Sequence, residues 1–360
     1  MSRRINLSNI YSYIFNDLPL FLLAFNYIFY NALPYADYKN YLRIIALTLF
    51  LIGWLITGPY RISKIELICL AIVGFELIIN GSLAINLTAL VGYAILSKRN
   101  IDEDINRMFY ICFILCFILL ILISLGLVSN TTYISTMGRS RSTLGFNNPN
   151  VAALFYSTIV YLYLLSRKTI TYKHLILSSI LTIVVFYFTD SRTSFVSLSL
   201  FIIIITLTNL KTTRIEFLIK KIAVVFIDSI FVLNLISIFF INKFMKYDVL
   251  TSYRLSSFQM MINEAGLTGL LFGGTNYSVD SFYYMFIFSY GLIAFVLFMI
   301  IVHFSVNQLI ATNNYRMLAF LFAVFIGGMM ESSIIRPELL STLLVWKTII
   351  KPQTLEVISG

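Results

Sequence analysis

Long apolar stretches alternate with short polar turns along nearly the whole chain. A helix that crosses a bilayer needs about 20 mostly apolar residues, because the hydrocarbon core is about 30 Å thick. The apolar stretches have roughly this length. They predict an all-α, polytopic integral membrane protein with about 12 transmembrane helices, at residues 12–33, 40–58, 64–80, 81–97, 107–128, 149–166, 172–189, 193–209, 219–241, 279–302, 315–334 and 338–350.

Two of the polar connections are long, at about 129–148 and 242–279. Both lie on the outer side when the N-terminus is placed inside, and an even number of spans then places the C-terminus inside as well. Neither connection is long enough to form a domain with its own core. We therefore predict one transmembrane domain over residues 1–360, with cytoplasmic termini and with its chemistry at the outer membrane surface.

Composition narrows the class of protein. Apolar residues make up 59% of the chain and charged residues 12%, whereas soluble domains are about half apolar and a quarter charged. A water-soluble enzyme, a nucleic-acid binder and a disordered chain are thereby excluded. We interpret the net charge of +10 as a sign of how the chain is oriented in the membrane, because most basic residues fall in the predicted inner connections. No nucleic-acid partner is expected. The lipid bilayer is the predicted environment of the protein.

Five arginines that lie in or next to polar turns fall on the predicted outer side, against the tendency of basic residues to stay inside. A guanidinium offers a planar fork of donors that matches phosphate oxygens. We therefore predict a pyrophosphate site at the outer headgroup level. The alternatives are contact with lipid headgroups and pairing with nearby acids. The five are Arg139, Arg141, Arg192, Arg254 and Arg336.

Two short motifs place arginines beside helix starts. In the first, Asn148 has the features of an N-cap and Pro149 those of a first helical residue, with Arg141 just upstream. Such a helix start binds anions readily. In the second, Arg192 would begin a helix, where a cation is disfavoured. Its expected partner is an anion, either Asp190 or a ligand.

Amide, aromatic and acidic side chains near the same side are candidates for contact with sugars. Amides pair with hydroxyls and rings stack on sugar faces, although tyrosines at span ends are also typical of an interfacial belt. Asp280 precedes an apolar run and is expected either to cap it or to deprotonate a sugar hydroxyl. Glu331 is expected to pair with Arg336 or Arg254. The predicted glycan-binding residues are Asn147, Asn150, Asn276, Tyr277, Tyr283 and Glu331.

Other kinds of chemistry find little support. The three cysteines lie in apolar runs and only two histidines occur, so no cluster with metal-ligand spacing appears. No phosphate-binding or dinucleotide glycine motif is present. No metal and no cofactor are expected. Two further acids inside spans, Glu76 and Asp228, are expected to make buried contacts between helices.

The order of the motifs is informative. The pattern Arg-x-x-x-Gly-Phe-x-Asn-Pro-Asn runs over 141–150, and Ser-Arg-Thr follows at 191–193. A late outer loop then carries Arg254, a glycine pair, Asp-Ser-Phe-Tyr at 280–283 and Gly291. In this arrangement the chain resembles the Wzy-type polysaccharide polymerases, which join O-antigen or capsule repeat units and are relatives of the O-antigen ligases.

The resemblance implies a metal-independent membrane glycosyltransferase at the outer face of the bacterial cytoplasmic membrane. Its substrates would be undecaprenyl-pyrophosphate-linked oligosaccharides, with a chain-length regulator and a flippase of the same pathway as partners. Arg141, Arg192 and Arg254 match the family's arginines. The ligase histidine is missing from the late loop, which favours a polymerase and leaves Asp280, with Arg192 and Arg254, as the expected catalytic set. A flippase of the same lipid, a ligase-like glycan transferase and a scaffold are the alternatives.

Overall fold

The computed structural model describes residues 11, 13–32, 39–56, 62–97, 99–134, 138, 140–210, 213–248, 254–275 and 279–352. Within these ranges the chain is almost entirely helical, with one two-stranded hairpin. The predicted all-α class is confirmed. The helices are α2 (Leu18–Ala32), α3 (Lys39–Ile56), α4 (Lys64–Asn80), α5 (Ile85–Leu96), α6 (Ile101–Ser124), α7 (Pro149–Leu165), α8 (Tyr172–Thr189), α9 (Arg192–Asn209), α10 (Thr213–Phe239), α11 (Ile241–Phe244), α12 (Arg254–Phe272), α13 (Phe282–Ala311), α14 (Tyr315–Gly328) and α15 (Leu340–Ile350).

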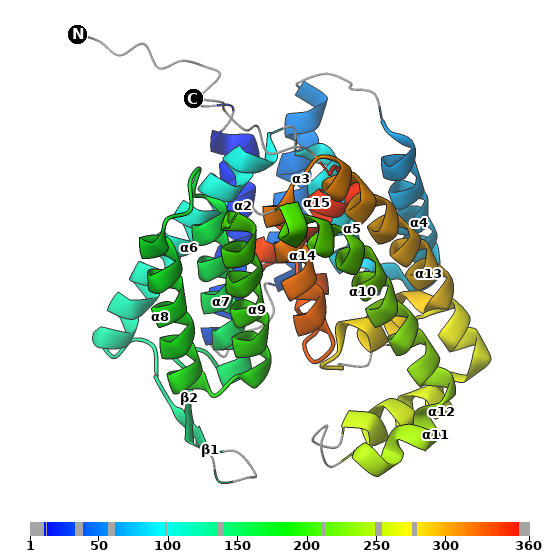
Figure 1. Cartoon of the computed structure of the whole chain (residues 1–360). Helices are drawn as coiled ribbons and strands as arrows, with labels where there is room; N and C mark the ends of the chain where they lie inside the picture. Colours follow the sequence, from blue (N-terminus) through cyan, green and yellow to red (C-terminus); the bar gives the residue numbers. More distant parts are fainter. Residues whose placement is uncertain are drawn as a thin grey trace.

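Apolar periodicity predicted most of these helices well. The bounds of α8 are those predicted, and α7 and α9 differ by one residue at one end. In Figure 1, α7, α8 and α9 stand side by side. Five helical stretches of the described chain are long and apolar enough to cross a membrane, namely α6, α8, α9, residues 219–239 of α10, and α13.

Three predicted spans are shorter than a crossing requires. Helices α5, α14 and α15 have 12, 14 and 11 residues. At about 1.5 Å per residue each extends only about 16–21 Å, against a hydrocarbon core of about 30 Å. These elements are therefore not complete spans by themselves.

Large apolar side chains cover the outside of the bundle. Phe117 on α6, Ile183 on α8 and Leu233 on α10 are among the many that are more than half exposed. Apolar surface of this extent would be unstable in water and mark contact with lipid or another protein. The structure thus supports the predicted membrane location.

The predicted long outer loops contain regular structure. Residues 242–279 were expected to be a loop, which is wrong for α12, because this helix packs along α13 with the Phe258 and Tyr284 rings stacked 4.0 Å apart. The loop 129–148 holds an antiparallel hairpin of β1 (Thr132–Ile134) and β2 (Ser140–Ser142).

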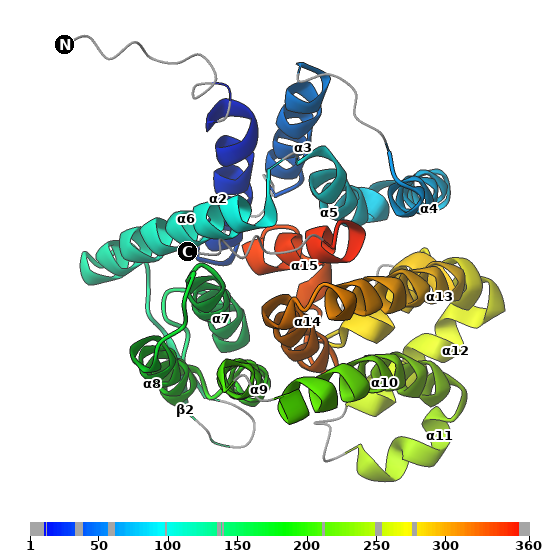
Figure 2. The ribbon, with the colours of Figure 1, turned by 45° about the horizontal axis from the view of Figure 1, so that its top comes forward.

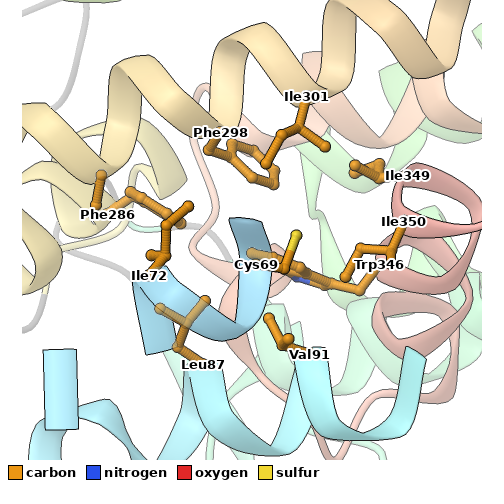
Figure 3. Close-up of a pocket in the computed structure, with 11 residues that line it drawn as sticks. Cys69, Ile72, Leu87, Val91, Phe286, Phe298, Ile301, Trp346, Ile349 and Ile350 are labelled. Carbon is orange, nitrogen blue, oxygen red and sulfur yellow. The ribbon is translucent and has the colours of Figure 1, made fainter. Parts of the chain in front are cut away.

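Helix α15 lies at the centre of the bundle. All of its residues are buried, and it packs against α2, α4, α5, α6, α7 and α13 (Figure 2). Most of its side chains are apolar, as is typical of a buried helix, and its one charged residue, Lys347, is buried as well. Figure 3 shows a small cavity beside it, of about 10 Å³, lined only by apolar side chains and by the buried thiol of Cys69. This cavity is therefore a packing defect and not a candidate functional site.

A glycine kink joins α12 to α13. Gly291 has φ +82° and ψ 162°, so it interrupts the backbone ladder inside α13. The carbonyls of Phe288 and Ser289 are then free to accept the N–H groups of Thr275 and Gly274, each at 3.2 Å. The same approach leaves no room for a side chain at Gly291, where a Cβ would lie 2.3 Å from the Leu271 carbonyl oxygen.

Replacing Gly291 with alanine is expected to lower the melting temperature of the purified protein strongly. This backbone region costs a non-glycine residue on the order of 1–3 kcal/mol, and the new Cβ also collides with backbone. Gly74→Ala is the control, because Gly74 is helical and a Cβ there meets nothing within 4 Å. Equal melting temperatures for the two variants would contradict this account of the kink.

Candidate functional site

Arg141 links three segments at one end of the bundle. Its Nε donates to the Thr189 carbonyl at 2.7 Å, at the end of α8, and its Nη2 donates to Asn150 Oδ1 at 2.5 Å, at the start of α7. The hairpin sets its position by pairing Arg141 with Tyr133. Asn148 caps α7 by accepting from Asn150 N at 2.8 Å, as predicted.

Arg192 is the first residue of α9 and is exposed. No ion pair joins it to Asp190, which ends α8 with φ +45°. Across the described residues its guanidinium has no hydrogen-bond or ion-pair partner. Ser191 holds the cap position, but its hydroxyl donates to Ser194 Oγ rather than capping the helix. The local pair expected as an alternative is therefore absent here.

Arg254 and Asp280 form an ion pair between the start of α12 and the segment before α13. Nη2 and Nε of the arginine lie 3.0 and 3.1 Å from Asp280 Oδ2, and Nη1 lies 3.3 Å from Met330 Sδ. Asp280 does not cap α13, because Ser281 occupies the cap position. The expected cap is wrong, since the aspartate side chain turns toward Arg254 instead.

Glu331 lies between these arginines, in the connection that follows α14. It is 6% exposed. Burial and the Asp280 charge raise its pKa, while Arg254, Arg336 and Arg141 lower it, and the net result is a pKa of about 7. None of these guanidiniums lies within the 4.0 Å of a direct ion pair, so the predicted contact pair with Arg336 or Arg254 is not formed.

The connection from α14 to α15 holds Arg336 as well. This arginine donates to Ser332 Oγ at 3.3 Å and lies beside the hydroxyl of Tyr27, on α2. The connection is fixed from the other side by a buried ion pair between Arg43 on α3 and Glu338. Sequence analysis missed this anchor, since nothing local associates α3 with the end of the chain.

A small cavity of about 30 Å³, lined by both apolar and hydroxyl side chains, lies behind Glu331. It lies between α7, α9, α14 and the start of α15. Among its lining groups, Tyr161 and Ser197 are joined at 2.6 Å, and Thr158 and Ser341 at 2.7 Å. Sequence analysis missed this feature, although polar residues one turn apart on apolar helices signal it. Hydroxyl side chains that line it are Ser157, Thr158, Tyr161, Thr193, Ser194, Ser197, Ser333, Ser341 and Thr342.

The other predicted glycan-binding residues have different outcomes. Asn147 is exposed, and its N–H donates to the Asn31 carbonyl at 2.6 Å. Tyr283 was expected to face a glycan, and this is wrong. Its ring is fully buried and its hydroxyl donates to the Phe325 carbonyl at 2.8 Å. Three predicted site residues lie outside the described part of the chain: Arg139, Asn276 and Tyr277.

Of the two acids predicted to make contacts between helices, Asp228 does so, whereas the hydrogen bond of Glu76 lies within α4. Glu76 accepts a hydrogen bond from Asn80 at 2.5 Å, and Asn80 also reaches the Phe272 carbonyl at the end of α12. Asp228 on α10 contacts His303 Nδ1 on α13 at 2.8 Å. Both contacts lie away from the arginine cluster.

The site therefore consists of Arg141, Arg254, Arg336, Asp280 and Glu331, brought together from segments far apart in the sequence. Arg192 stands next to it, directly before the cavity-lining Thr193. Such a group of guanidiniums suits an anion with several phosphate oxygens. Comparison of the chain with protein-family models, with curated proteins and with solved structures finds no match in any of the three.

Proposed function

We propose that the protein joins lipid-linked oligosaccharide repeat units into a surface polysaccharide. The observation that supports this most is that the charges of Arg141, Arg254 and Arg336 all act on the buried Glu331. Three guanidiniums at one end of an apolar bundle suit a pyrophosphate headgroup whose prenyl chain lies in the bilayer. We place this end at the outer face of the bacterial cytoplasmic membrane, with about 12 membrane segments and both termini in the cytoplasm.

The proposed reaction is a glycosyl transfer between two undecaprenyl-pyrophosphate-linked oligosaccharides. An acceptor hydroxyl forms a bond to the anomeric carbon of the donor glycan, and the bond from that carbon to the phosphate oxygen breaks. Negative charge then develops on the leaving pyrophosphate, where fixed guanidiniums stabilise it. Arg192, exposed at the start of α9, offers a further donor fork to the same headgroup, and Asp280 holds Arg254 in place.

Reconstitution tests this function directly. Purified protein in lipid vesicles, supplied with undecaprenyl-pyrophosphate-linked repeat units, is expected to produce a ladder of longer glycans without a nucleotide sugar. Movement of the lipid-linked unit across the vesicle without longer products would indicate a flippase instead. A single transfer to a different acceptor would indicate a ligase-like transferase. A protein that shows neither polymerisation, nor movement of the lipid-linked unit, nor a single transfer would favour the scaffold alternative.

A deletion strain gives an independent result. Loss of a polymerase leaves single repeat units displayed on the outside of the cell, because export continues. Loss of a flippase traps lipid-linked units on the inside. Radiolabelled sugars with protease- and phosphatase-accessibility assays distinguish the two outcomes, and the second would overturn the proposal.

A further inference from the structure

We propose that Glu331, rather than Asp280, accepts the proton of the attacking sugar hydroxyl. This inference rests on the proposed function, since it assigns a role within that reaction. It comes from the contacts of the two carboxylates, which differ although both lie in the same arginine cluster.

Asp280 is already engaged. Two donors of Arg254 contact its Oδ2 at 3.0 and 3.1 Å. The side chain is also 60% exposed, so water surrounds the rest of it. Its Oδ2 is therefore occupied by the guanidinium of Arg254 and is not free to accept a sugar proton. Its geometry suits a positioning residue that orients Arg254.

Glu331 is buried and has an open carboxyl. Across the described residues, no side chain or backbone N–H donates to it within hydrogen-bonding distance, although it is only 6% exposed. Its carboxylate oxygens are not among the fully enclosed side-chain atoms that lack a partner, so water reaches them and no described protein donor occupies that place. Here the missing partner would be the hydroxyl of a substrate that lies between Glu331 and the arginines.

The cavity beside Glu331 provides surroundings in which this carboxyl can change its charge. Its volume of about 30 Å³ exceeds the about 10–15 Å³ that one water molecule needs. Hydroxyls of Thr193, Ser194 and Ser333 line it together with Glu331. A water molecule held there would solvate the carboxylate from behind and carry its proton away after the transfer.

The charges around Glu331 also suit a general base. Its pKa of about 7 results from burial and Asp280, which raise it, against Arg254, Arg336 and Arg141, which lower it. General bases work best with a pKa near the working pH. Because the base must be deprotonated, the rate is expected to rise with pH through about 7.

The step balances without a further reactant. The acceptor oxygen forms its bond to the anomeric carbon and gives its proton to the Glu331 carboxylate. The electron pair of the broken carbon–oxygen bond stays on the pyrophosphate, which leaves as an anion beside the arginines. The proton then passes from Glu331 to water, which restores the carboxylate.

The test is polymerisation by Glu331→Gln, an isosteric change that removes the basic group. A loss on the order of 10²–10⁴-fold in rate is expected. Glu331→Asp is expected to keep part of the activity, and its rate is expected to rise with pH as in the wild type. The residual rate of Glu331→Gln is expected not to rise with pH. Glu103→Gln, an exposed acid at the opposite end of the bundle, is the control and is expected to match the wild type.

Two further measurements separate catalysis from folding. Undecaprenyl pyrophosphate is expected to raise the melting temperature of Glu331→Gln as much as that of the wild type, because its arginines remain. Sodium formate, but not sodium chloride, is expected to restore part of the activity of Glu331→Ala, since it supplies a small carboxylate. A structural role would be rescued by neither salt.

The results separate two kinds of failure. A wild-type protein that makes no ladder overturns the proposed function itself. A wild-type protein that makes a ladder, with Glu331→Gln equally active, overturns only the role of Glu331. Asp280→Asn provides a third check, because removing its charge is expected to shift the acidic limb of the pH profile to lower pH. An unshifted limb would contradict the assignment of that limb to Glu331.

Discussion

Replacing Arg254 with alanine is expected to reduce polymerisation by about 10²–10³-fold, the effect typical of removing one donor to a developing negative charge. Its Nη1 faces only the Met330 sulfur, a weak acceptor that a phosphate oxygen would displace. The Asp280 pair is exposed and contributes no more than about 1 kcal/mol to stability. Loss of folding would therefore not account for the loss of activity, which rate measurements at saturating lipid-linked substrate would show.

Matched variants distinguish a direct contact of the Arg254 guanidinium with phosphate from an effect of its positive charge alone. Arg254→Lys keeps the charge but loses the fork, so an intermediate rate is expected. Arg107→Ala, at the other end of the bundle with a 3.9 Å contact to Asp17 and a guanidinium 5.6 Å from the Tyr13 ring centroid, is expected to be fully active. If Arg254→Ala polymerises normally while its melting temperature is unchanged, the pyrophosphate site is wrongly placed.

Replacing Lys347 with methionine is expected to cost about 3–5 kcal/mol of stability, because it removes the nearest countercharge of the buried Asp104 and leaves it with Arg99 at 4.0 Å. Lys347 and Asp104 have side chains that are 0% and 1% exposed and form an ion pair. The ammonium also donates to Ser97 Oγ at 2.9 Å and to the Arg99 carbonyl at 2.7 Å. These bonds hold α15 against the start of α6. The measurement is thermal unfolding in detergent.

The double variant Lys347→Met with Asp104→Asn tests the reason for this loss. The neutral amide still accepts the Tyr93 hydroxyl, which bonds Asp104 at 2.7 Å. We expect the double variant to recover much of the stability, because no unpaired charge remains. If the two losses simply add, methionine has damaged the packing of α15, and the charge pair is not the cause.

Much of the helical fold could be predicted from local sequence. In lipid, an apolar segment between polar turns is stable as a helix, because a helix makes the hydrogen bonds of its backbone within the segment itself. This is why α8 begins and ends as predicted, and why Asn148 and Pro149 begin α7. The hairpin and α12 were missed, because both depend on contacts with neighbouring segments. The Phe258 ring of α12, for example, is buried where it stacks on Tyr284 of α13.

The candidate site could be predicted in part. The arginines were visible in the sequence as residues that oppose the predicted charge bias, and the charges of Arg141, Arg254 and Arg336 do act together on Glu331. The different roles of Asp280 and Glu331 were not visible. Both are acids near outer arginines in the sequence, and only the structure shows that one is bonded and exposed while the other is buried and open.

By itself the sequence determined the helical class, the apolar surroundings and the side of the bundle that carries the arginines, because these follow from residues near one another in the chain. Tertiary structure alone decided that α15 lies at the centre, that Arg43 anchors Glu338, and that Glu331 faces a cavity lined with hydroxyls. The reason is physical. Hydrophobicity and capping act within a few residues, whereas burial, pKa and the gathering of charges depend on which distant segments pack together.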